Sequence, residues 1–196
     1  QLARARADLR MGVPVVLAGE AQAALVLAAE TLTAQRLADV LALGGAPVLA
    51  ITARRAETLK ARAYDGTLAR VLLPPGATPA WVQSIADPAD DLRAPMKGPL
   101  KTARGGDTAA HSAALDLVKA ARMLPAALVL DLPLGADFAR LHGLTVIDLT
   151  AAAPILARRS ALHPVVNARL PMEVSEAGRL HIFRPEDGGE EHYAIE

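Results

Sequence analysis

The sequence predicts an α/β domain, in which a sheet carries helices on both faces, followed by a small antiparallel β segment. Short apolar runs alternate with segments whose apolar residues recur at helical spacing, and most of these runs are continuously apolar, as strands covered on both faces are. After about residue 160 the strand-like runs follow one another with no helix between them, which predicts the β segment. The 196 residues suffice for one domain plus a fragment.

The chain is predicted to begin with a helix and two strands. Residues 3–10 place arginines between apolar positions, as a short amphipathic helix does, and Gly12 ends this helix. The apolar runs 13–17 and 24–28 are long enough for buried strands and too short for helices.

The next four elements continue the alternation. The residues Thr31-Leu32-Thr33 open a helix whose apolar positions recur at helical spacing up to Leu43, after which a Gly-Gly pair ends it. An apolar run at 47–51 predicts a buried strand. Residues 53–63 predict a helix with charged residues on its outer face, and 70–73 predict a strand that two prolines stop.

The pattern weakens between residue 74 and about residue 108. Six prolines and a Gly-Gly pair in this stretch predict a long loop around a short helix at 79–85. Regular alternation then returns. It predicts a helix at 108–123, strands at 127–132 and 144–149, and a last helix at 150–159 whose N-cap is Thr150.

The C-terminal residues form three strand-like segments, at 167–174, 179–184 and 191–195. A meander of this size cannot bury a core of its own, so it must pack on the first domain, on a partner, or on sequence that this chain lacks. We therefore predict two domains, 1–160 and 161–196, and expect the second to be truncated.

The composition excludes several classes of function. Basic and acidic residues both number 21, so the formal net charge is zero, and the only aromatic residues are one tryptophan, two tyrosines and two phenylalanines. This balance argues against nucleic acid or a membrane surface as a partner. No apolar run approaches the ~20 residues of a spanning helix, so we expect a cytoplasmic protein. Because cysteine is absent, disulfides, thiolate catalysis and zinc sites that need sulfur are excluded.

Several short motifs resemble those of one enzyme family. They are Ala28-Ala29-Glu30-Thr31, Ala86-Asp87-Pro88, Asp91-Leu92-Arg93-Ala94-Pro95, Gly98-Pro99-Leu100, Arg104-Gly105-Gly106, Asp116-Leu117, Pro125-Ala126 and Asp131-Leu132. In this order they resemble 3,4-dihydroxy-2-butanone-4-phosphate synthase over residues 3–160. The resemblance implies the fold of that family and a homodimer. The family converts ribulose 5-phosphate to dihydroxybutanone phosphate and formate, using Mg²⁺ to polarise the sugar and carboxylates to move protons.

The C-terminal segment resembles a second family. Its motifs are Asn167-Ala168-Arg169-Leu170-Pro171, Arg184 and Glu191-His192-Tyr193-Ala194-Ile195, and they look like the opening strands of GTP cyclohydrolase II. The two domains occur fused in this order in riboflavin biosynthesis. In that family a zinc ion held by three cysteines serves the hydrolysis of GTP, so zinc is expected in a cyclohydrolase part that this chain lacks.

The synthase resemblance implies an acidic metal-binding loop after the first strand. Here the corresponding residues 18–23 form a shorter loop with a single carboxylate, Glu20. The histidine that the family has before Pro99 is replaced by Met96. Because a hard cation needs several oxygen ligands, we expect Glu20 to belong to a vestigial metal site.

The second ligand motif of the family, Arg-Gly-Gly-His-Thr-Glu, aligns with this chain in two ways. Without a gap, Asp107 or Ala110 stands at the ligand histidine, and with a gap His111 takes that place. A lone histidine near the start of a helix is also typical of a surface or capping residue. The metal ligands that the resemblance implies are therefore Glu20, Asp107 and His111, with the register left open.

Two further features are candidates for binding substrate and for catalysis. Arg104, Gly105, Gly106 and Thr108 precede a helix, where backbone N–H groups and the arginine charge can bind a phosphate. A capped helix after a glycine turn has the same pattern. Asp131 stands at the end of a strand where the family has a catalytic glutamate, and a carboxylate that ends a strand without chemistry is the alternative.

These resemblances predict the N-terminal portion of a GTP cyclohydrolase II-type riboflavin biosynthesis protein with a degenerate synthase-like domain. By itself the chain is expected to be non-catalytic and to serve a structural or dimerisation role as a homodimer, with GTP or a phosphosugar as the ligand of the parent family. The alternative is a Mg²⁺-dependent 3,4-dihydroxy-2-butanone-4-phosphate synthase that acts on ribulose 5-phosphate through Asp131, Glu20 and Asp107 or His111.

Overall fold

The computed structural model describes residues 1–20, 22–89, 91–93, 95, 97–133, 135–156, 162–186 and 190–196. The chain folds into two compact units, Gln1–Ala157 and Arg158–Glu196. The boundary predicted after residue 160 and the Met96 position both fall outside the described residues.

The first unit alternates helices and strands along most of its length. In chain order its elements are α1 (Leu2–Arg10), β1 (Val15–Ala18), β2 (Ala23–Ala28), α2 (Ala34–Ala42), β3 (Val48–Thr52), α3 (Ala53–Thr58), β4 (Leu68–Leu72), α4 (Pro79–Ala86), α5 (Ala109–Ala120), β5 (Ala126–Leu132), α6 (Gly135–Leu141), β6 (Thr145–Asp148) and α7 (Leu149–Leu156). No helix among the described residues is long and apolar enough to cross a bilayer.

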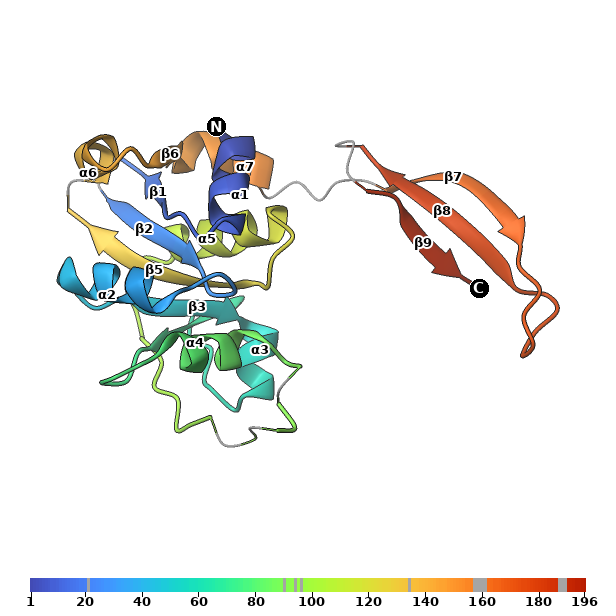
Figure 1. The fold of residues 1–196 in the computed structure, drawn as a ribbon, viewed down its shortest axis with the longest axis horizontal. Helices are drawn as coiled ribbons and strands as arrows, with labels where there is room; N and C mark the ends of the chain where they lie inside the picture. The colour runs from blue at the N-terminus through green and yellow to red at the C-terminus, as the bar shows by residue number, and fades with distance from the viewer. Residues whose placement is uncertain are drawn as a thin grey trace. The chain divides into compact units, whose positions relative to one another are not determined.

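The strands of the first unit form one mixed sheet in the order β4-β3-β5-β2-β1-β6 (Figure 1). Among the described residues of this sheet, β1 and β6 pair in parallel and the other four pairings are antiparallel. Side chains alternate between the faces, so Leu25 and Leu27 of β2 pack on the side of α2, α3, α4 and α6, whereas Val26 packs on the side of α1, α5 and α7. Helices on both faces of a sheet confirm the predicted fold class.

Three helices begin at a threonine that caps them. Thr33, Thr52 and Thr78 precede α2, α3 and α4, and each side-chain oxygen accepts a hydrogen bond from the backbone N–H three residues later at 3.2 Å. This bond satisfies a donor that the first turn of a helix leaves unpaired. Local sequence therefore sets where these helices start.

Some predicted boundaries in the first unit are wrong. The helix predicted at 53–63 ends at Thr58, because Lys60 adopts a left-handed backbone with φ of 56°. Helix α6 was not predicted. The stretch predicted as a loop does contain α4, and it also contributes a segment near Thr102 that pairs with the free edge of β4.

The second unit is a three-stranded antiparallel sheet in the order β7-β8-β9, with β7 at Leu162–Arg169, β8 at Arg179–Pro185 and β9 at His192–Ile195. The predicted antiparallel β segment is thus confirmed. Its first strand begins at Leu162 and not at residue 167, and a bulge lies between Pro164 and Val166. A proline is tolerated in an edge strand, because its missing N–H can face away from the neighbouring strand.

Candidate functional site

The predicted glycine motif lies between the free edge of β4 and the start of α5. The backbone runs beside β4, with hydrogen bonds from Ala103 N to Arg70 O and from Leu72 N to Lys101 O, both 2.8 Å. Gly105 and Gly106 then turn the chain into α5 with φ angles of 73° and 82°. Residues other than glycine adopt such angles at a cost, so the glycine pair is what allows this turn.

A buried ion pair next to the glycine turn holds the turn in place. Arg70 donates from Nε and Nη2 to the two carboxylate oxygens of Asp65, at 2.9 Å and 3.1 Å, and the side chains are 9% and 6% exposed. The same guanidinium also donates to the carbonyl oxygen of Gly105. Arg70 therefore connects β4, the preceding loop and the glycine turn.

Asp107 occupies the position just before α5 and already has hydrogen-bond donors. Its carboxylate accepts a hydrogen bond from Ala109 N at 3.0 Å and another from the Gln22 side-chain amide. These bonds lower the pKa of Asp107 below its usual value. Thr108 stands at the N-cap position, but its side chain makes no capping bond, so Asp107 supplies the acceptor at this helix start.

His111 lies in the first turn of α5 on the buried side of the helix and is 5% exposed. Its Nδ1 has no hydrogen-bond partner among the described residues. Burial and the nearby charge of Arg70 lower the pKa of His111, against weaker opposing effects of Asp131, Asp65 and Asp107. The imidazole is therefore neutral at neutral pH.

The buried imidazole should make stability depend on pH. The unfolded chain binds a proton near the ordinary pKa of 6.5, and the folded chain binds it only at lower pH. Stability is thus fully present above pH ~6.5 and declines as pH falls below it, by at most about 1.4 kcal/mol per pH unit. Urea unfolding should show this decline in the wild type and a smaller one in His111→Leu. The exposed His142 provides the matched control, and a decline in His142→Leu below that of the wild type would count against the assignment.

The structure brings only part of the predicted site together. Asp131, exposed near the end of β5, is close enough to His111 to affect its pKa, as is Asp107. Glu20 is exposed in the hairpin between β1 and β2, two residues from the Gln22 that contacts Asp107. The guanidinium carbon of Arg104 lies 5.2 Å from the centre of the Tyr64 ring.

Three residues of the cluster around the glycine turn were not predicted from the sequence. Arg70 and Asp65 form its buried ion pair, and Gln22 is the donor to Asp107. A signal for Arg70 was present, because a charged residue stands between Ala69 and Val71 in an otherwise apolar strand. A buried charge of this kind requires a partner, which the sequence alone does not locate.

The residues present do not fit a Mg²⁺ site. Among the described residues, no three histidine, aspartate or glutamate side chains gather closely enough to hold a metal ion. The carboxylate of Asp65 is already paired with Arg70, and that of Asp107 with Gln22 and a backbone amide. A hard cation needs several oxygen ligands that are free to bind it, and these two carboxylates are already engaged.

A second ion cluster lies on the other face of the sheet, at the end of α4. Arg55 is buried and donates from Nε to Ile85 O at 2.7 Å and from Nη2 to Asp91 Oδ1 at 2.8 Å. Lys97 donates to the same carboxylate and to Ser84 O at 2.6 Å. Both cations hold the pKa of Asp91 well below its usual range. The cluster therefore anchors the loop after α4.

The architecture of the first unit matches solved structures. A cation-free 3,4-dihydroxy-2-butanone 4-phosphate synthase superposes with a TM-score of 0.60 at 17% identity, over 79% of this chain and 96% of that chain. A 3,4-dihydroxy-2-butanone 4-phosphate synthase in complex with two magnesium ions gives a TM-score of 0.57 at 18% identity, over 79% of this chain and 95% of that chain. The chain has the fold of 3,4-dihydroxy-2-butanone 4-phosphate synthase. RibBX, a two-domain synthase from A. baumannii, covers all of this chain and 69% of its own length, with a TM-score of 0.57 and 16% identity.

Sequence comparison finds a relative that is named for a different enzyme. This chain is 33% identical over 203 residues to a GTP cyclohydrolase-2 from Azospirillum brasilense. The match covers 98% of this chain and 52% of that protein, so the chain spans about half the length of its curated relative. No protein-family model matches the chain. The resemblance to a synthase followed by a cyclohydrolase segment is thus confirmed.

Proposed function

We propose that this chain is the N-terminal portion of a GTP cyclohydrolase II-type protein of riboflavin biosynthesis. The observation that carries the proposal is the 33% identity to a GTP cyclohydrolase-2 across 98% of the chain, which includes both units. The structural likeness to synthases supports the fold alone. The zinc and the GTP chemistry of such a protein then belong to the part of the relative that the match does not cover.

In this proposal the synthase-like unit is not catalytic and has a structural role. The arrangement of charged side chains next to the glycine turn supports this part of the proposal. Arg70, a cation, is bound between Asp65 and the Gly105 carbonyl. The remaining carboxylate at the start of α5, Asp107, already accepts two hydrogen bonds. A unit of this kind can contribute folding stability and a dimer surface to a cytoplasmic parent protein without binding a phosphosugar.

One observation favours the alternative, a Mg²⁺-dependent synthase that acts on ribulose 5-phosphate. Asp107, His111 and Asp131 interact electrostatically, so three of the predicted site residues do converge. A neutral, buried imidazole beside an exposed carboxylate could move a proton. The Arg104-Gly105-Gly106 turn would then bind the phosphate of the sugar.

Formate release from ribulose 5-phosphate decides between the two readings. With and without Mg²⁺, the purified chain should produce formate at the rate of a protein-free blank, and Asp131→Ala should not change that rate. GTP turnover and zinc content should also be at background. Magnesium-dependent formate release that Asp131→Ala abolishes would establish the synthase instead. Light scattering on the same sample tests the structural role, because the proposed dimer should have twice the mass of the chain.

A further inference from the structure

A cavity of about 380 Å³ lies between α2 and α6, which are both labelled in Figure 1. These helices pack on one face of the sheet, whereas α5, which carries His111, packs on the other. Pro14 and Leu144 line the cavity just before the paired strands β1 and β6 begin. Glu20, in contrast, follows the end of β1. The cavity is therefore separate from the candidate site around the glycine turn.

The cavity has largely apolar walls and one aromatic ring. Leu25 of β2, Val40 of α2 and Leu144 contribute aliphatic side chains, and α6 contributes Phe138, which is half-buried. A partly exposed ring offers a flat surface against which a second ring can pack. An apolar cavity of about 150 Å³ holds one benzene molecule, so this larger one has room for roughly two fused rings.

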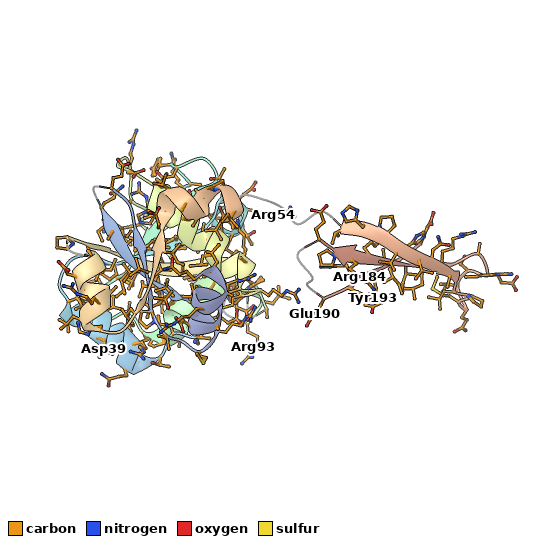
Figure 2. The ribbon with its side chains drawn as sticks, turned by 90° about the horizontal axis from the view of Figure 1, so that it is seen from above. Asp39, Arg54, Arg93, Arg184, Glu190 and Tyr193 are labelled. Carbon is orange, nitrogen blue, oxygen red and sulfur yellow. The ribbon has the colours of Figure 1, made fainter. Side chains whose placement is uncertain are left out.

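Polar side chains stand along the rim of the cavity. They are Arg36 and Asp39 of α2 and His142, whose ring centre lies 4.3 Å from that of Phe138. Asp39, labelled in Figure 2, accepts a hydrogen bond from the Gln35 side-chain amide at 2.8 Å. Its carboxylate therefore already has a donor.

Arg36, by contrast, keeps donors for a ligand. Its Nη1 is 3.9 Å from Asp39 Oδ2, well beyond the ~2.8 Å of a charge-assisted hydrogen bond. Among the described residues, the guanidinium makes no hydrogen bond. A guanidinium binds a carboxylate through two parallel N–H groups. The rim of the cavity is thus better prepared for an anionic group than for a cationic one.

We propose that the cavity between α2 and α6 binds a small planar aromatic carboxylate of about two fused rings. The ring system packs among Val40, Phe138 and Leu144, and the carboxylate pairs with Arg36. His142 supplies a further donor, because an imidazole carries at least one N–H in its neutral and its protonated form. This binding site is independent of the proposed function, since it shares no residue with the glycine turn or with His111.

Titration of the chain with naphthalene-2-carboxylate, followed by NMR, tests the proposal. Saturable shifts are expected at Leu25, Val40 and Leu144, which line the cavity, and not at Leu180 or Ile182 of the second unit. The neutral naphthalene-2-carboxamide should bind about tenfold more weakly, because hydrogen bonds to an ionised acceptor are the stronger ones. The absence of saturable shifts overturns the proposal, and so does equal affinity for the acid and the amide.

Four variants locate the site and the charge that it recognises. Arg36→Gln should weaken binding of the acid about tenfold and leave that of the amide unchanged, whereas Arg54→Gln, at an exposed arginine of α3, should change neither. Asp39→Asn should strengthen binding of the acid about twofold, because it removes a repelling charge, and a folding defect would not do so. Ala42→Trp, at an exposed position on the cavity wall, should fill the cavity and abolish binding. Unchanged affinity in Ala42→Trp or in Arg36→Gln overturns the proposal.

Discussion

Arg70→Ala is expected to lower the unfolding free energy of the first unit by about 3–5 kcal/mol. The substitution leaves the Asp65 carboxylate, 6% exposed, without its counter-charge and without both of its hydrogen bonds to the guanidinium. It also removes the donor to Gly105 O in the turn before α5. The helical circular-dichroism signal reports this unit, because all helices of the described residues belong to it.

A second readout distinguishes this role from general loss of packing. The Arg70 charge is one cause of the lowered pKa of His111, so that pKa should rise in Arg70→Ala when it is followed by NMR. The matched control is Arg104→Ala, which removes an exposed arginine and its contact with Tyr64. Arg104→Ala should lower the unfolding free energy by about 0.5–1 kcal/mol. Equal costs for the two variants would contradict a buried ion pair at Arg70.

Arg55→Ala is expected to cost about 3 kcal/mol, or a fall in melting temperature of roughly 6–12 °C. Arg55 supplies donors to the carbonyl oxygens of Ser84, Ile85 and Asp87 at the C-terminal end of α4. The C-terminal end of a helix leaves such carbonyls unpaired, and a positive charge there interacts favourably with the negative end of the helix dipole. Lys97 continues to neutralise Asp91, which keeps the loss below that of a fully unpaired buried charge.

The neighbouring residue in α3 is a close control for this prediction. Arg54 is exposed and is labelled in Figure 2. Arg54→Ala changes the same type of residue in the same helix and should change the unfolding free energy by no more than about 0.5 kcal/mol. Thermal unfolding of the two variants side by side measures the difference. An equal fall in melting temperature in Arg54→Ala and Arg55→Ala would contradict the stabilising role of the buried contacts of Arg55.

Elements with a strong local signal were predicted well. The apolar run of β5 and the starts of α2, α3 and α4 lie close to their predicted positions. Helix α6 was missed because Gly135–Leu141 is only seven residues long, which is too short for a clear helical period. The start of β7 was placed too late, since its proline and histidine are not typical of a strand and only the pairing with β8 shows that they belong to one.

The candidate site was predicted in part for a similar reason. Asp107, Gly105 and Gly106 stand in one local motif before a helix, and spacing was enough to single them out. The partners that decide their state come from elsewhere in the sequence. Gln22 lies 85 residues from the Asp107 it contacts, and Arg70 lies 35 residues from Gly105.

The sequence alone determined the fold class, the antiparallel second sheet and the resemblance to two families, because periodicity, glycine turns and helix caps act over a few residues. Only the tertiary structure decided the strand order, the burial of His111 and the pairing of Arg70 with Asp65. Burial and charge pairing depend on which distant segments meet, and that information is carried by the packed chain as a whole. It was therefore the folded structure that placed the Arg70 cation beside the glycine turn and near His111, one of the residues that the family resemblance implies as metal ligands.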